Sequence, residues 1–172
     1  MKRMADLVGR DLIWNQPKAL HSAFELSDGA DVVSTLVFRS SFGSLATATS
    51  ADGAWTFKRQ GFFRPTVTVR PEGQESDLAI FRNQTWSSGG TLEFPDGRRL
   101  LGSTNFWQSR YEWTTESETP VISYRSRSGL LRMSATMVLH DLARDWPELP
   151  WIASLGWYLK VLMHRDSAAA AV

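Results

Sequence analysis

Apolar and polar residues alternate over most of the first 140 residues, in short runs divided by turn sequences. In the run GAWTFKRQ, Trp55 and Phe57 share one face, and in TVTVR, Val67 and Val69 do the same. A period of two residues is the pattern of a β-strand with one face in the core and one face in solvent. This part of the chain is therefore predicted to form antiparallel sheet.

Turn sequences recur every eight to twelve residues and divide this region into twelve expected strands. Asp28–Gly29, Asp52–Gly53 and Asp96–Gly97 supply residues that adopt the positive φ of tight turns. In the last strand we expect Leu131, Met133, Ala135 and Met137 to share the buried face. The expected strands are residues 6–14, 19–26, 32–39, 44–50, 54–60, 65–71, 78–84, 90–94, 99–102, 105–114, 120–126 and 130–140.

After residue 140 the pattern changes to the sequence LPWIASLGWYLKVLMHRD at 149–166, which is apolar on all sides of a helix. We expect a helix at about 148–165 and a frayed tail at 167–172. Such a helix is covered on all sides by protein or by lipid. Fifteen residues span about 22 Å, whereas a hydrocarbon core requires about 30 Å, and Lys160 interrupts the run.

The helix thus has three interpretations: a helix buried within this protein, a membrane tail anchor, or a contact helix of an oligomer. The first agrees best with the strands, because about twelve antiparallel strands can close into a barrel that needs filling. The expected fold is a mostly β, closed antiparallel barrel enclosing a hydrophobic C-terminal helix, with residues 1–166 as a single domain. We expect Gly156 to mark a close approach of a wall side chain to the helix.

Charge and cysteine content exclude several classes of function. Lys and Arg number 19 and Asp and Glu number 18, so the formal net charge of +1 argues against a nucleic-acid partner. The chain has no Cys, which excludes disulfides and thiolate chemistry. The N-terminal sequence MKRMADLVGRDLIW lacks the apolar core of a signal peptide. We expect a cytoplasmic protein that is peripheral to a membrane when it binds lipid.

No pattern of catalytic or metal-binding residues occurs. The histidines at 21, 140 and 164 are widely spaced, and neither a G-x-S-x-G elbow nor a nucleotide-binding glycine motif is present. His140–Asp141 and the acidic residues Glu112, Glu116 and Glu118 are better explained as structural residues or ordinary turn residues. We therefore expect no enzyme activity, no metal and no cofactor.

The candidate binding residues are Lys58, Arg59 and Arg64, which flank the apolar sequence GFF. Arg guanidinium groups suit anionic head groups because they form paired hydrogen bonds. A second basic set, Arg125, Arg127 and Arg132, flanks a turn. Ordinary solvated strand ends are the alternative explanation for both sets. The aromatic residues that could line a binding cleft are Phe62, Phe63, Trp86, Phe106, Trp107 and Trp113.

The strand number, the segment GFFRPTVTVR and the final helix ASLGWYLKVL resemble the tubby C-terminal-like superfamily over about residues 6–165. This superfamily includes tubby, LURP-one-related and phospholipid scramblase proteins, and the resemblance implies a twelve-stranded barrel threaded by a hydrophobic helix. It also implies a non-enzymatic binding or scaffold module that recognises anionic phospholipid or a small amphipathic ligand. The alternatives are a protein tethered to a membrane by its last helix and a β-barrel enzyme.

Overall fold

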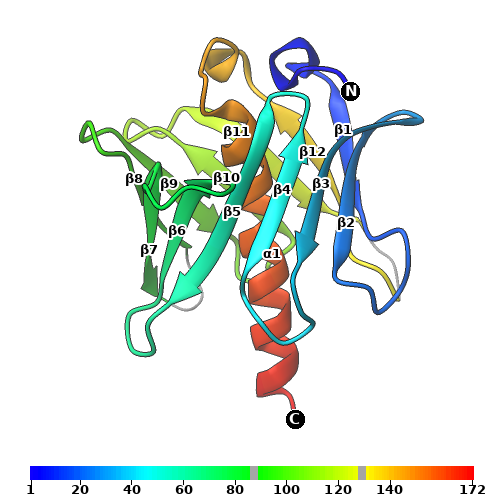
Figure 1. Cartoon of the computed structure of the whole chain (residues 1–172), viewed down its shortest axis with the longest axis vertical. Helices are drawn as coiled ribbons and strands as arrows, with labels where there is room; N and C mark the ends of the chain where they lie inside the picture. The colour runs from blue at the N-terminus through cyan, green and yellow to red at the C-terminus, as the bar shows by residue number, and fades with distance from the viewer. Residues whose placement is uncertain (86–88, 128–130) are drawn as a thin grey trace.

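The computed structural model describes residues 1–85, 89–127 and 131–172 and is mostly β (Figure 1). Twelve strands form one closed barrel, in which each strand is antiparallel to both neighbours and β1 closes on β12. The strands are β1 (Asp11–Asn15), β2 (Ala23–Asp28), β3 (Asp31–Phe38), β4 (Ala46–Ser50), β5 (Gly53–Gln60), β6 (Thr66–Pro71), β7 (Ala79–Thr85), β8 (Gly89–Glu93), β9 (Arg99–Thr104), β10 (Arg110–Thr114), β11 (Pro120–Ser126) and β12 (Ser134–Leu139).

The predicted barrel, its twelve antiparallel strands and the C-terminal helix are confirmed, and the predicted inward faces are largely correct. Trp55, Phe57, Val67 and Val69 are all buried. Two short 3₁₀ helices, η1 (Met4–Leu7) and η2 (Asp141–Ala143), complete the fold together with the helix α1 (Leu149–Ala170).

Four predicted strands, at 6–14, 19–26, 105–114 and 130–140, begin four or five residues later than expected, at residues 11, 23, 110 and 134. The first begins at residue 11, because Met4 and Leu7 are buried by a 3₁₀ turn that places residues three apart on one side. Residues 105–109 form a turn before β10. The last strand begins at residue 134, so the expected inward position of Leu131 is wrong: its side chain is exposed.

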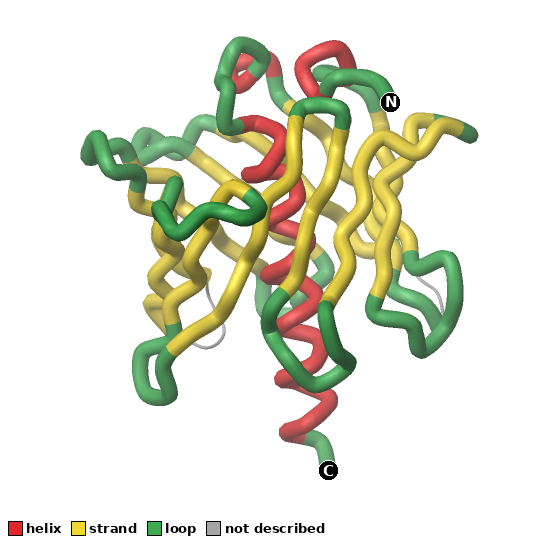
Figure 2. Tube along the Cα trace, viewed as in Figure 1, coloured by secondary structure: helices red, strands yellow, loops and turns green. Residues whose placement is uncertain are grey.

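The helix α1 extends to Ala170, beyond the expected end near 165, and its residues 149–162 are all buried. Glu148 stands at the N-cap position without a side-chain hydrogen bond to the helix, and Pro150 lies in the first turn, where the missing N–H costs no hydrogen bond. α1 contacts β3, β4 and β5 and also β10 and β11, which lie on opposite arcs of the barrel order. Figure 2 shows the last turns of α1 extending beyond the strands.

Hydrogen bonds and ring contacts join α1 to the strands along its length. The hydroxyl of Tyr124 on β11 donates to the carbonyl oxygen of Ala153 at 2.7 Å, and the hydroxyl of Tyr158 donates to the carbonyl oxygen of Ser44 at 2.7 Å. The indoles of Trp14 on β1 and Trp157 stack with centroids 5.7 Å apart. The helix is thus tied to different parts of the barrel by polar as well as apolar contacts.

Gly156 is a point of close approach between α1 and a side chain of the barrel wall, as the sequence predicted. A Cβ atom at this position would lie 2.5 Å from Cζ and 2.7 Å from Cε2 of Tyr124. Such distances require the tyrosine ring or the helix to move, and the ring is held by its bond to Ala153.

Gly156→Ala is therefore expected to destabilise the protein, although the same change in an ordinary helix stabilises by about 1 kcal/mol. Overpacking of a core costs about 1–3 kcal/mol, and after the helix gain is subtracted we expect a net loss of up to about 2 kcal/mol in chemical denaturation. The double variant Gly156→Ala/Tyr124→Phe should lose less stability than the sum of the losses in the two single variants. The reason is that the hydroxyl oxygen of Tyr124 is the atom nearest to the added Cβ. A rise in stability on Gly156→Ala would contradict the close contact.

Candidate functional site: the loop rim

The two ends of the barrel carry different connections. Because every strand is antiparallel to its neighbours, alternate connections lie at the same end. The end at which α1 finishes carries the connections 16–22, 39–45, 61–65 and 105–109 and the residues 127 and 131–133 (Figure 1). We call the described residues of these connections the loop rim.

The other end of the barrel, here the far end, carries the N-terminal segment, η2 and the start of α1 (Figure 1). Its connections between strands and before α1 are residues 29–30, 51–52, 72–78, 94–98, 115–119 and 140–148.

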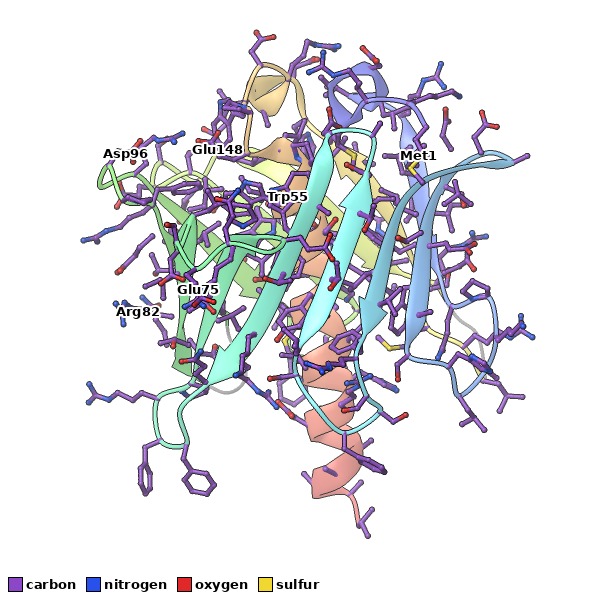
Figure 3. The ribbon with its side chains drawn as sticks, in the orientation of Figure 1. Met1, Trp55, Glu75, Arg82, Asp96 and Glu148 are labelled. Atoms are coloured by element: carbon purple, nitrogen blue, oxygen red, sulfur yellow. The ribbon has the colours of Figure 1, made fainter. Side chains whose placement is uncertain are left out.

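Acidic residues are segregated from the loop rim. The sequence of the connections at that end contains no Asp or Glu, and its basic residues are Lys18, Arg39, Arg64, Arg127 and Arg132. At the far end the connections carry Asp52, Glu72, Glu75, Asp77, Asp96, Glu116, Glu118, Asp141, Asp145 and Glu148. Figure 3 shows Asp96 and Glu148 at the end opposite the C-terminal turns of α1. A net charge near zero thus conceals a strongly polarised molecule.

Ion pairing follows the same division. At the far end, Lys2 and Arg10 bind the carboxylate of Asp28 at 2.8 and 2.7 Å, and Arg98 binds both Asp96 and Glu148. Among the described residues, none of the five basic side chains of the loop rim forms a salt bridge. Their charge is therefore available to a partner.

Large apolar side chains are exposed on the same loops. Phe62 and Phe63 in the β5–β6 connection are 83% and 89% exposed, and Phe106 and Trp107 in the β9–β10 connection are 87% and 80% exposed. Each pair packs edge to face, with ring centroids 5.2 and 5.1 Å apart. The remaining exposed apolar side chains of the loop rim are Leu20, Phe42 and Leu131. Exposed apolar groups gathered on one surface mark an interaction site, whereas scattered ones do not.

The predicted binding residues lie on one arc of this end of the barrel. Arg64 belongs to the loop rim beside Phe63, and Lys58 is exposed on β5 close to it. Arg59 instead binds Asp166 on α1 through two hydrogen bonds of 2.6 and 3.1 Å, which attach the helix to β5. The structure therefore gives Arg59 a structural partner, whereas neither Lys58 nor Arg64 forms a salt bridge with any residue that the structure describes.

A cavity of about 620 Å³ opens within the loop rim, between the final turns of α1 and the connections on the β1 and β12 side. Arg127 and Arg132 of the second basic set line it, together with His21 and His164. Arg125, the third member of that set, lies exposed on β11 outside the lining.

Lys160 and Arg165 on α1 also line the cavity and were not predicted as site residues. Lys160 is only 5% exposed, and its Nζ donates to the carbonyl oxygen of Gln108 at 3.2 Å. Burial disfavours the charged ammonium and lowers the pKa of Lys160 to about 8. Burial also lowers the pKa of Arg165, whose guanidinium stacks 4.0 Å from the ring centroid of Phe38.

The remaining candidates for chemistry lie away from this end. Ser123 donates to Glu112 at 2.9 Å and contacts Nε2 of His140 at 2.9 Å, so its proton is already held by the carboxylate. Glu116 and Glu118 are exposed in the β10–β11 connection. Among predicted cleft aromatics, Trp113 is fully buried and Trp86 lies outside the described residues. Within the described part of the chain, no group of His, Asp and Glu side chains has the arrangement of a metal site.

Comparison with family models, with curated proteins and with solved structures finds no match to this chain. Across the residues that the structure describes, no helix has both the length and the apolar character needed to cross a bilayer.

Proposed function

We propose that this protein is a non-enzymatic binding module whose loop rim docks on the surface of an anionic membrane. The observation that carries the proposal is a coincidence in the described connections at one end of the barrel, which carry exposed aromatic side chains and basic side chains without a salt bridge, but no Asp or Glu. Aromatic rings are favoured at the level of lipid head groups, where they bury an apolar body beside polar groups. Basic side chains near an anionic leaflet contribute about 1 kcal/mol each.

The polarity of the charge supports this orientation. The acidic far end is repelled by anionic lipid while the loop rim is attracted, so the field turns the barrel before contact. Close to the surface, partial insertion of the rings adds short-range affinity that salt does not screen. The two contributions differ in this respect, which makes them separable by experiment.

A membrane explains this surface better than a protein partner does. The exposed apolar side chains come from five separate connections, and four of these five connections also carry a basic residue. Protein interfaces have an apolar core that is depleted in charge. Loop tips that carry single rings or pairs of rings suit a soft surface into which each tip inserts on its own.

The helix has a different role in this proposal. Its buried residues and its contacts with opposite arcs of the barrel support a hydrophobic helix enclosed by the strands, which forms the core of a single domain over 1–166. It therefore holds the loop rim in place rather than entering lipid as a tether. The barrel and its C-terminal helix agree with a small member of the tubby C-terminal-like superfamily, and we place the protein in the cytoplasm at the membrane periphery.

Co-sedimentation with vesicles tests the function. The protein is expected to sediment with phosphatidylcholine vesicles that contain phosphatidylserine, and to remain largely in the supernatant with phosphatidylcholine alone. Binding should weaken as ionic strength rises, because exposed charges are screened over about 10 Å at 0.1 M salt. Equal recovery with neutral and anionic vesicles, or none with either, would exclude anionic membrane docking.

A further inference from the structure

The cavity within the loop rim is lined by side chains of one sign of charge, which is positive. Its Lys and Arg residues are Arg127, Arg132, Lys160 and Arg165, and none of the described residues that line it is Asp or Glu. Apolar side chains, among them Leu20 and Met163, complete the lining. The cavity therefore offers concentrated positive charge beside an apolar surface.

Lys160 shows that this charge is not simply a solvated protein surface. It is the only one of the four that is almost fully buried, and burying an ammonium group is unfavourable without partners. An ammonium group has three donors, and among the described residues only Gln108 accepts from it. The remaining donors are left for a group inside the cavity.

Two of the arginines are partly held by backbone oxygens. One guanidinium nitrogen of Arg132 donates to the carbonyl oxygen of Pro17 at 3.0 Å, and Arg165 donates to that of Gly43 at 3.1 Å. These hydrogen bonds hold each guanidinium group against a neighbouring loop, and they leave its positive charge unneutralised. Preorganised guanidinium groups lose less entropy when an anion binds.

We propose that the cavity binds the phosphate monoester head of an anionic lipid, of which phosphatidic acid is the simplest. A phosphate monoester carries about −1.5 to −2 charges at pH 7 and three strong acceptor oxygens. This matches several basic groups better than a carboxylate does, since a carboxylate carries a single charge. The apolar lining then faces the start of the lipid tails.

This inference rests on the proposed membrane docking, and it adds a preference for one head group. Vesicle binding of the native protein is compared between phosphatidylcholine vesicles containing phosphatidic acid and others containing phosphatidylserine, adjusted to equal zeta potential. Binding is expected to be about tenfold tighter with phosphatidic acid, which is the gain from one good charge-assisted bond.

Lys160→Met and Arg132→Gln should each bring the two affinities close together. Lys160→Met should retain binding to phosphatidylserine, whereas Arg132→Gln also removes a charge of the loop rim and should weaken that binding a few-fold. The Met variant is expected to fold, because methionine replaces a buried charged side chain with a neutral one of similar length. Thermal denaturation checks this. Arg125→Gln is the matched control: it removes a neighbouring exposed charge outside the cavity and should weaken binding to both vesicle types equally.

Calorimetry with glycerol 3-phosphate separates a lipid from a soluble phosphate monoester as the source of the head group. Binding of this compound by the native protein and its loss in Lys160→Met, without a phosphatidic acid preference, would support the same anion site with a soluble ligand. If the native protein shows neither a head-group preference nor glycerol 3-phosphate binding, the proposal is overturned. A preference that survives both cavity variants overturns it too. Failure of vesicle binding altogether overturns the docking instead.

Discussion

Leu155→Asp is expected to prevent the protein from folding. Leu155 lies in the middle of α1 and its side chain is completely buried. Transfer of a carboxylate into such a site costs several kcal/mol, and the loss of leucine packing costs about 2–5 kcal/mol more. The sum reaches the whole stability of a typical domain, about 5–15 kcal/mol. Circular dichroism and analytical gel filtration should show an unfolded or aggregated chain.

Two further variants show that burial, rather than the helix itself, causes this effect. Leu155→Ala keeps the site neutral and should fold with a stability lower by about 2–5 kcal/mol. Ala168→Asp introduces the same charge at an exposed position of α1 and should change stability by less than about 1 kcal/mol. A folded Leu155→Asp protein with nearly native stability would show that the helix does not form the core.

Removal of the four most prominent rings is expected to abolish most membrane binding. In a chain that carries Phe62→Ser, Phe63→Ser, Phe106→Ser and Trp107→Ser, each ring lost from the interface costs about 1 kcal/mol, below the value of about 1.5–3 kcal/mol for full burial. Four rings then give about 4 kcal/mol, or nearly a thousandfold in affinity for anionic vesicles. The side chains are exposed, so the fold should be unaffected.

Leu142→Ser is the matched control, because Leu142 is an exposed apolar residue at the far end. It should leave vesicle affinity unchanged. The proposal fails if the quadruple variant binds anionic vesicles as tightly as the native protein does. It also fails if Leu142→Ser weakens binding as much as the quadruple variant does.

Much of the fold was predictable because its information is local. Alternation places Trp55 and Phe57 on the inner face without reference to any distant residue, and the turn glycines mark where strands end. The predictions failed where apolar residues serve something other than a strand. Leu131 and Phe106 continue the apolar pattern of a strand, yet they belong to exposed loops.

The candidate site was less predictable, because it depends on which turns share an end of the barrel. In an antiparallel barrel, alternate connections lie at the same end. Numbering the connections along the chain and comparing the odd ones with the even ones would have shown that the odd-numbered connections lack Asp and Glu. The net charge hides this division. Lys160 was interpreted only as an interruption of an apolar run, since its contact with Gln108 joins residues far apart in sequence.

The central claim, that the loop rim is the surface that meets the membrane, is tested most directly by labelling each end of the barrel. The chain has no cysteine, so Phe63→Cys and Ser117→Cys each provide one attachment site for an environment-sensitive fluorophore. With anionic vesicles whose lipid tails are brominated, emission from the label at 63 should shift to the blue and be quenched, while emission from the label at 117 should not change. Quenching at 117 without quenching at 63, or equal quenching at both, would contradict the account.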